Sequence, residues 1–288
     1  MCPPEPLGNR RRQPWTRAFA LLAAMLAVLI ERRSQAAPPP SEHTLSVSLG
    51  YADHGVADRA ATALVYRGAA GAGAIDYAGE RSHLRWRASL GFAMGPYYAA
   101  HHPDRVAVFG TVAVNGSTED ITVPMRGRVL IPTASLGLDG RWSFGRVTLL
   151  AGGSLDYELF YAQGFVSAGL MQSLAARPSL RVRVDPSSAH RVEVGASTPI
   201  VAWVVRMPYH QTVSVPEQSP VAGLVRLGST VQGPASMQGV SVDAGYRYRI
   251  NHRVGVTARY RFAWQRNEVP RLLLRAEQQL LLGVEVYL

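Results

Sequence analysis

Charged side chains recur at alternate positions in many segments of this sequence, so that they would share one face of an extended strand. The arginines and carboxylates with this spacing are Arg85, Arg87, Asp156, Glu158, Arg181, Arg183, Arg191, Glu193, Asp243, Arg247, Arg249, Arg253, Arg259, Arg261, Glu277 and Glu285. Rings of arginine select anions in pores, whereas bidentate arginine–carboxylate pairs fill and neutralise an interior. The spacing therefore predicts a polar interior that is either basic and open or plugged by ion pairs.

Two groups of histidine and aspartate are the other candidates for chemistry. They are Asp53, His54 and Asp58 in one predicted outer loop, and His101, His102 and Asp104 in another. Such groups can bind a metal or serve a hydrolase, but a histidine beside an aspartate is also common in solvated loops. The sequence contains no dinucleotide-binding glycine motif after a strand, no phosphate-binding loop and no zinc-protease motif. We therefore expect no catalytic residue, no metal and no cofactor.

Long alternating strands are the elements that would position the charged residues. In 83–94, for example, Leu84, Trp86 and Leu90 have one parity while Arg85 has the other. Several alternating runs reach nine to thirteen residues, whereas strands of soluble proteins average about 5–6 residues and membrane-crossing strands need about 9–11. The lengths favour a transmembrane barrel over a soluble sandwich. The expected strands are 44–53, 60–76, 83–94, 128–138, 146–158, 166–184, 190–206, 238–249, 253–264 and 271–287.

The final segment of the chain carries the most specific signal. Alternate positions up to the last residue are apolar, namely Leu280, Leu282, Val284, Val286 and Leu288. This pattern resembles the C-terminal strand of bacterial outer-membrane β-barrel proteins, where these positions serve the insertion machinery. The usual terminal residue of that family is aromatic, whereas here Tyr287 lies one position out of register. The resemblance implies the outer membrane of a double-membraned bacterium, with lipid, lipopolysaccharide and the insertion machinery as partners.

The number of strands follows from the side on which the chain begins and ends. A barrel whose ends are both periplasmic needs an even number of strands. A further hairpin, 105–114 with 119–125, either crosses the membrane or protrudes from it. We therefore expect an all-β, antiparallel up-and-down transmembrane barrel over 44–288 with about ten to twelve strands, twelve being slightly preferred. Longer outer loops are expected near 95–127 and 207–237, and a periplasmic turn at 139–145.

Aromatic residues cluster near the ends of two predicted strands. They are Tyr246, Tyr248, Tyr260, Phe262 and Trp264. In a membrane barrel such residues form girdles at the two lipid–water interfaces, although aromatic side chains also pair across strands in any sheet. We expect girdles.

The first 37 residues have the order of an export signal. A basic segment with Arg10, Arg11 and Arg12 precedes the apolar run 18–30, and small residues follow at Ala36 and Ala37. We expect 1–37 to be a cleaved signal peptide and 38–43 a short periplasmic lead. The alternative is a short membrane anchor or an amphipathic tail.

Composition excludes several other classes of protein. The chain of 288 residues is 47% hydrophobic and 17% charged, which is too apolar for a disordered protein. It has no second long apolar run that would indicate a helical membrane protein, and its one cysteine excludes a disulfide scaffold. The net charge of +10 comes from arginine without any lysine, and we expect no nucleic-acid partner.

Three functions are compatible with these features. The first is a small channel or passive transport barrel with an arginine-rich lumen. The second is a structural or adhesive barrel that binds partners through its outer loops. The third, by resemblance to barrels of this size, is a hydrolase of the phospholipase or omptin type at the outer rim. A lumen between those of filled eight-stranded barrels and open 16-stranded porins is narrow, which favours the plugged interior. The sequence does not determine the oligomeric state.

Overall fold

The computed structural model describes residues 42–59, 64–104, 106–112, 118–124, 126–164, 170–206, 225–226 and 228–288. The predicted signal peptide and most of the periplasmic lead lie outside these residues. Within them, no helix is long and apolar enough to span a bilayer.

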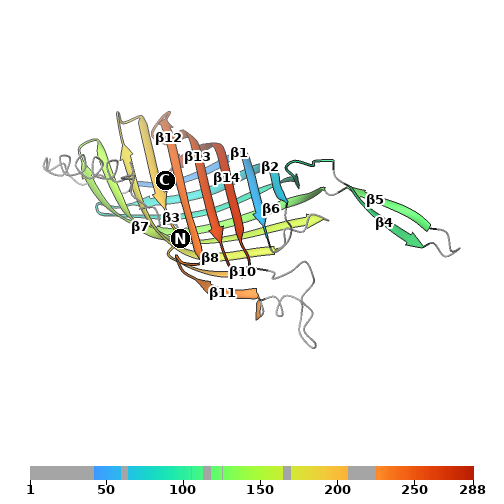
Figure 1. Ribbon diagram of the computed structural model, residues 1–288. Coiled ribbons are helices and arrows are strands. Elements are labelled where there is room, and N and C mark those ends of the chain that lie inside the picture. Colours follow the sequence, from blue (N-terminus) through green and yellow to red (C-terminus); the bar gives the residue numbers. More distant parts are fainter. Residues whose placement is uncertain are drawn as a thin grey trace, which may run out of the picture. The chain divides into compact units, whose positions relative to one another are not determined.

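Antiparallel strands form a closed barrel (Figure 1). Strands β1 and β14 pair with each other along their length, which joins the two ends of the described chain. The pairing of β8 with β9 then closes the sheet. The barrel strands are β1 (Glu42–Asp58), β2 (Val65–Glu80), β3 (Leu84–Ala99), β6 (Arg126–Phe144), β7 (Val147–Gly164), β8 (Leu170–Val184), β9 (His190–Ser197), β10 (Val201–Arg206), β11 (Ser229–Gln232), β12 (Met237–Arg249), β13 (Val254–Asn267) and β14 (Leu273–Tyr287).

Two of the crossings are each made of two shorter strands. Residues 179–184 of β8 pair with β9, and residues 171–176 pair with β10. The break between β9 and β10 contains Pro199, which has no N–H to donate to a ladder. On the next crossing, β11 pairs with β10 and β12 with β9, and a turn closed by the Met237 N–H on the Gly233 carbonyl joins them. Counting each broken strand once gives ten crossings.

The predicted antiparallel barrel is confirmed, with ten crossings and two strands outside them. Those two, β4 (Val106–Val112) and β5 (Thr118–Pro124), form a separate two-stranded sheet. This is the hairpin whose crossing of the membrane would have raised the expected number of strands from ten to twelve. Its two strands pair only with each other. The predicted turn at 139–145 is also displaced, because β6 continues to Phe144 and the chain reverses at Gly145, whose φ is +64°.

Both ends of the barrel wall lie on the same side. Thr44 of β1 pairs with Tyr287 of β14, and the short connections 81–83, 145–146 and 250–253 lie at this end as well. Short turns are periplasmic in barrels of this kind, and longer connections face outward. We call this side the periplasmic end and the opposite side the outer end.

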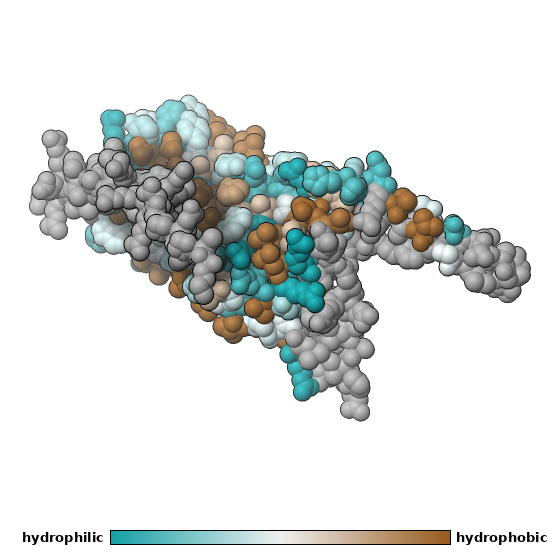
Figure 2. Space-filling model, viewed as in Figure 1, coloured by the Kyte–Doolittle hydropathy of each residue, from teal (hydrophilic) through white to brown (hydrophobic). Residues whose placement is uncertain are grey.

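The outer surface of the barrel is apolar. Leu49, Leu90, Leu136 and Leu282 are each exposed by 61–65% of their surface, and Figure 2 shows hydrophobic side chains along the described wall. A closed barrel has no unpaired edge, so its backbone is satisfied without water. An apolar exterior on such a barrel is the arrangement that faces lipid.

The apolar belt ends before the strands do. On the outward face of β1 and β2, Asp53 and Arg67 follow the belt and pair at 3.7 Å. On β14 the belt runs from the C-terminus to Leu280, and the next outward position is Gln278. Strands β1, β6 and β7 have 17, 19 and 18 residues, whereas crossing a bilayer takes about 9–11. The wall therefore projects beyond the hydrocarbon layer at its outer end.

Candidate functional site

Ion pairs cross the interior of the barrel at its periplasmic end. Arg183 of β8 donates from Nη1 to Glu80 Oε2 of β2 at 2.8 Å. Arg85 of β3 donates from Nη1 to both carboxylate oxygens of Glu193 on β9, each at 2.8 Å. Strands β8 and β2, like β3 and β9, are not neighbours in the sheet. These contacts therefore join opposite walls rather than adjacent strands.

The same kind of contact continues toward the outer end. Arg259 of β13 reaches Asp76 of β2 with Nη2 at 2.6 Å from Oδ2. Arg275 of β14 pairs with Glu158 of β7, and farther out Arg206 of β10 pairs with Asp58 of β1. Each of these arginines pairs with a carboxylate on a strand that is not its neighbour in the chain or in the sheet. Charge-assisted hydrogen bonds therefore connect the strands across the interior.

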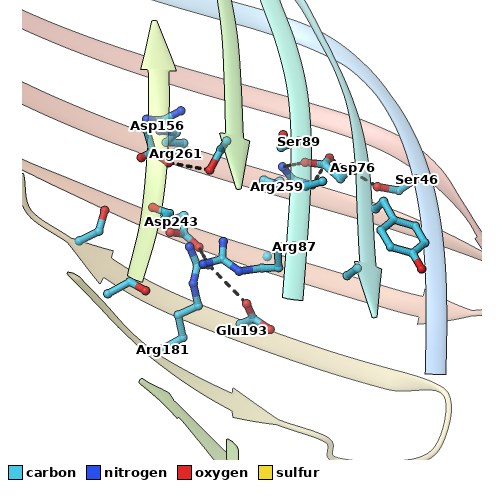
Figure 3. Close-up of a pocket in the computed structure, with 18 of the residues that line it drawn as sticks. Ser46, Asp76, Arg87, Ser89, Asp156, Arg181, Glu193, Asp243, Arg259 and Arg261 are labelled. Atoms are coloured by element: carbon cyan, nitrogen blue, oxygen red, sulfur yellow. Dashed lines mark hydrogen bonds and ion pairs between the residues drawn. The ribbon is translucent and has the colours of Figure 1, made fainter. Parts of the chain in front are cut away.

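Between these pairs lies a polar cavity of about 270 Å³. Figure 3 shows charged side chains from several strands pointing into it. The predicted interior residues that line this cavity are Arg85, Arg87, Asp156, Glu158, Arg181, Arg191, Glu193, Asp243, Arg247, Arg259, Arg261 and Glu285.

Four predicted interior residues lie elsewhere. Glu277 is buried beside His54 and pairs with Arg275 at 2.6 Å. Arg183 is fully buried beside the cavity, among Glu80 and Glu193. Arg249 lies at the periplasmic end, where it pairs with Glu42 and its guanidinium lies 4.0 Å from the centre of the Tyr287 ring. Arg253 is exposed outside the lumen, because β13 begins at Val254 and Arg253 belongs to the turn before it.

Sequence reasoning missed several interior charges. Asp76 follows a run of glycine and alanine without clear alternation, and Asp139 falls in what was predicted to be a turn. Asp139 is fully buried and accepts a hydrogen bond from Arg87 Nε at 2.9 Å. Arg177 precedes a proline within β8 and lies 3.3 Å from Asp156. Extending the alternation through these interruptions would have identified all three.

Aromatic and aliphatic side chains fill the interior at the outer end. Tyr97 is fully buried, stacks on Tyr66 with ring centres 5.3 Å apart and meets Phe160 edge-on at 6.0 Å. Ile131 and Met171 are buried in the same cluster. We call this group the outer plug. Its members come from β2, β3, β6, β7 and β8, so side chains from five strands occupy the interior at this end.

The first histidine–aspartate group does not form a loop site. Strand β1 continues to Asp58, so Asp53 lies on one face of the strand and His54 and Asp58 lie on the other. His54 is fully buried in the interior, with Nδ1 3.6 Å from Glu277, while Asp58 is engaged by Arg206. Asp53 faces outward. The predicted outer loop at this position is therefore wrong, because the strand is longer than its alternating segment indicated.

The second histidine–aspartate group is exposed at the outer end. Asp104 pairs with Arg126 at the start of β6, and His101 and His102 are exposed beside it. Within the described ranges, no three histidine, cysteine, aspartate or glutamate side chains lie together as metal ligands would.

The predicted interface aromatics lie at two levels of the wall. Tyr246 and Tyr248 are near the periplasmic end of β12, and the Tyr246 hydroxyl is 2.7 Å from His190 Nδ1. Tyr260 donates to Gln278 at 3.3 Å, and Phe262 and Trp264 follow it toward the outer end of β13. On the last strand, all of Leu280, Leu282, Val284, Val286 and Leu288 are exposed on the outer surface.

No protein-family model and no curated protein matches the chain. Solved structures with some similarity include the outer-membrane protease OmpT of Escherichia coli, at 10% identity, covering 89% of this chain and 99% of that chain, with a TM-score of 0.45. The translocator domain of the autotransporter NalP from Neisseria meningitidis is 13% identical, with coverage of 94% and 97% and a TM-score of 0.38. The toluene transporter TodX of P. putida is 8% identical, with coverage of 87% and 90% and a TM-score of 0.32. None of them assigns a solute, substrate or partner to this chain.

The class of this protein follows from its own surfaces. The barrel is closed, its exterior is apolar and its interior carries the charges. A soluble barrel has the opposite arrangement, with an apolar interior and a charged exterior, whereas a barrel that spans the bacterial outer membrane presents apolar side chains to lipid. The surfaces of this protein are therefore those of a membrane-spanning β-barrel.

Proposed function

We propose that this protein is a closed-lumen barrel that binds partners at the cell surface rather than conducting solutes. The observation that carries the proposal is the filling of the interior from both ends. Pairs such as Arg183–Glu80 and Arg85–Glu193 tie opposite walls together at the periplasmic end. The outer plug packs the lumen at the other end. A barrel built in this way is a rigid support.

The surfaces that this rigid barrel would present to a binding partner lie at its outer end. The wall extends beyond the apolar belt there, and the β4–β5 hairpin is inserted between the outer ends of β3 and β6. On β4, Val106 and Val108 are exposed by 45% and 59%. An exposed apolar strand is a surface on which other chains or ligands pack. These features support the adhesive interpretation more than the transport one.

Planar-bilayer recording of the detergent-refolded protein tests the closed lumen. We expect no discrete conductance steps, and regular steps from the wild-type protein would overturn the proposal. Replacing 105–125 by a short Gly-Ser linker tests the binding role. Cells that display this variant should adhere less to immobilised lipopolysaccharide, glycan or protein surfaces than cells that display the wild type. Equal adherence on every surface would remove the hairpin from the proposal.

A small anion channel is the second candidate, and the polar cavity favours it. Several arginines line this cavity, including Arg181 and Arg259, and arginine rings select anions. If the barrel does conduct, Arg181→Glu and Arg259→Glu should shift its ion preference toward cations. Unchanged selectivity in both variants would place the conducting path elsewhere.

A further inference from the structure

Nearly every interior charge of the described chain has a partner of opposite sign. The interior and rim carboxylates Glu42, Asp58, Asp76, Glu80, Asp139, Asp156, Glu158, Asp185, Glu193, Asp243, Glu277 and Glu285 each lie within 4 Å of an arginine nitrogen. The arginines that line the cavity follow the same rule with one exception. Among the described residues, Arg261 has no carboxylate within that distance.

The geometry of Arg261 leaves most of its guanidinium available. Its Nε donates to Ser241 Oγ at 3.2 Å, which fixes the side chain against β12. Its Nη1 and Nη2 groups have no hydrogen-bond partner among the described residues, and neither is sealed away as a buried unpaired atom. The residue lines the polar cavity (Figure 3). Two parallel donors of an arginine fork therefore face the cavity.

The surroundings of Arg261 include charges of both signs and hydroxyl groups. Asp243 is its register partner on β12 and Glu277 lies within electrostatic reach of it, although neither carboxylate is within 4 Å of its guanidinium. Arg177 also lines the cavity, and the two guanidinium groups lie within electrostatic reach of one another. Ser135 and Ser154 line the cavity too. Like charges repel more strongly in a partly desolvated site than in water. An anion between them would relieve that repulsion and satisfy the free donors.

We propose that this cavity binds a small oxyanion or carboxylate through the guanidinium fork of Arg261. A planar fork with two free N–H groups matches a carboxylate or phosphate in bidentate fashion. A volume of about 270 Å³ admits a small solute but not a macromolecule. The site is independent of the proposed surface role, because a barrel that does not conduct can still hold an anion.

The cavity lies nearer the periplasmic end of the barrel than the outer end. Its lining extends to Thr44, Arg191 and Arg247, near the periplasmic ends of their strands. Toward the outer end, the interior is occupied by the outer plug, including Tyr97 and Phe160.

Calorimetric titration of the full-length refolded protein tests the site. Sodium phosphate, sulfate and acetate are titrated separately at constant ionic strength, so that the three arms separate an oxyanion from a carboxylate. We expect saturable binding of at least one of them to the wild type. Arg261→Gln should weaken that binding by about tenfold or more, and Arg253→Gln, which removes an equal charge from an exposed turn, should leave it unchanged.

Two results would overturn the assignment. One is the absence of saturable binding of all three anions to wild-type protein that shows the heat-modifiable gel migration of a folded barrel. The other is unchanged affinity in folded Arg261→Gln. If that variant does not fold, Arg261→Lys replaces it. Lysine keeps the charge but lacks the fork, so we expect weaker binding, and undiminished binding would exclude recognition by the fork.

Discussion

The guanidinium of Arg183 and the carboxylate of Glu80 form a bidentate pair across the barrel, with Nη1–Oε2 at 2.8 Å and Nη2–Oε1 at 2.5 Å. Arg183 is fully buried and Glu80 nearly so. Arg85 and Glu193 extend the contact into a network, at 3.4 Å from Glu80 and 3.3 Å from Arg183 respectively. This network joins β2, β3, β8 and β9 across the periplasmic end of the lumen.

Replacing Arg183 by Met should destabilise the barrel strongly. The substitution leaves Glu80 buried with only its weaker contacts, and breaking a buried pair in this way costs about 3–5 kcal/mol. The matched control is Arg266→Met, because Arg266 pairs with Glu268 at 2.7 Å where both side chains are more than two-fifths exposed, and such pairs contribute about 0–1 kcal/mol. Equilibrium unfolding by urea in lipid vesicles measures both, and equal effects would show that the network is not a stabilising element.

A charge placed in the apolar belt should oppose insertion more than the same charge just outside it. Leu282→Arg puts a guanidinium on the lipid-facing side of β14, at a cost of about 2–4 kcal/mol near the bilayer midplane. Gln278→Arg lies on the same face of the same strand but beyond the belt, where the cost falls to about 0–1 kcal/mol. The free energies of unfolding in vesicles give the comparison. A larger effect at Gln278 would mean that the belt has been placed at the wrong height.

Removing the outer plug should loosen the closed end. Tyr97→Ala combined with Phe160→Ala deletes two rings that meet edge-on in the interior, and each such truncation costs about 3–5 kcal/mol in a packed core. If the plug blocks the lumen, the double variant should also produce conductance steps that the wild type lacks. The control is Tyr161→Ala on the outward face of β7, which should leave the lumen closed. A silent double variant that is folded would show that the ion-pair layer alone blocks conduction.

The β4–β5 hairpin should be accessible from outside the cell. An epitope inserted between residues 115 and 116 should be detected by antibody on intact cells, because the hairpin lies at the end opposite the paired residues Thr44 and Tyr287. The same epitope inserted between Asn251 and His252, in a short turn at the periplasmic end, should be detected only after the outer membrane is permeabilised. The reverse pattern would invert the assignment of the two ends.

Much of the fold was predictable because alternation is a local property of a strand. The parity of Leu282 and Val284, or of Arg259 and Arg261, follows from the pleat, which sends successive side chains to opposite faces. The same reasoning failed where the alternation is interrupted. Glycine and alanine hid the interior position of Asp76, and an assumed turn hid that of Asp139.

The sequence by itself determined a lipid-facing parity, a charged parity and an even-stranded antiparallel barrel. Only the tertiary structure decided which arginine meets which carboxylate, because partners such as Arg183 and Glu80 are 103 residues apart and are brought together by the closure of the sheet. Closure also gathered Tyr66, Tyr97 and Phe160 into a plug from three strands. It left Arg261 as the cavity arginine without a carboxylate within 4 Å among the described residues. The physical reason is that pairing across a lumen depends on the tilt and stagger of every strand at once, which no single segment encodes.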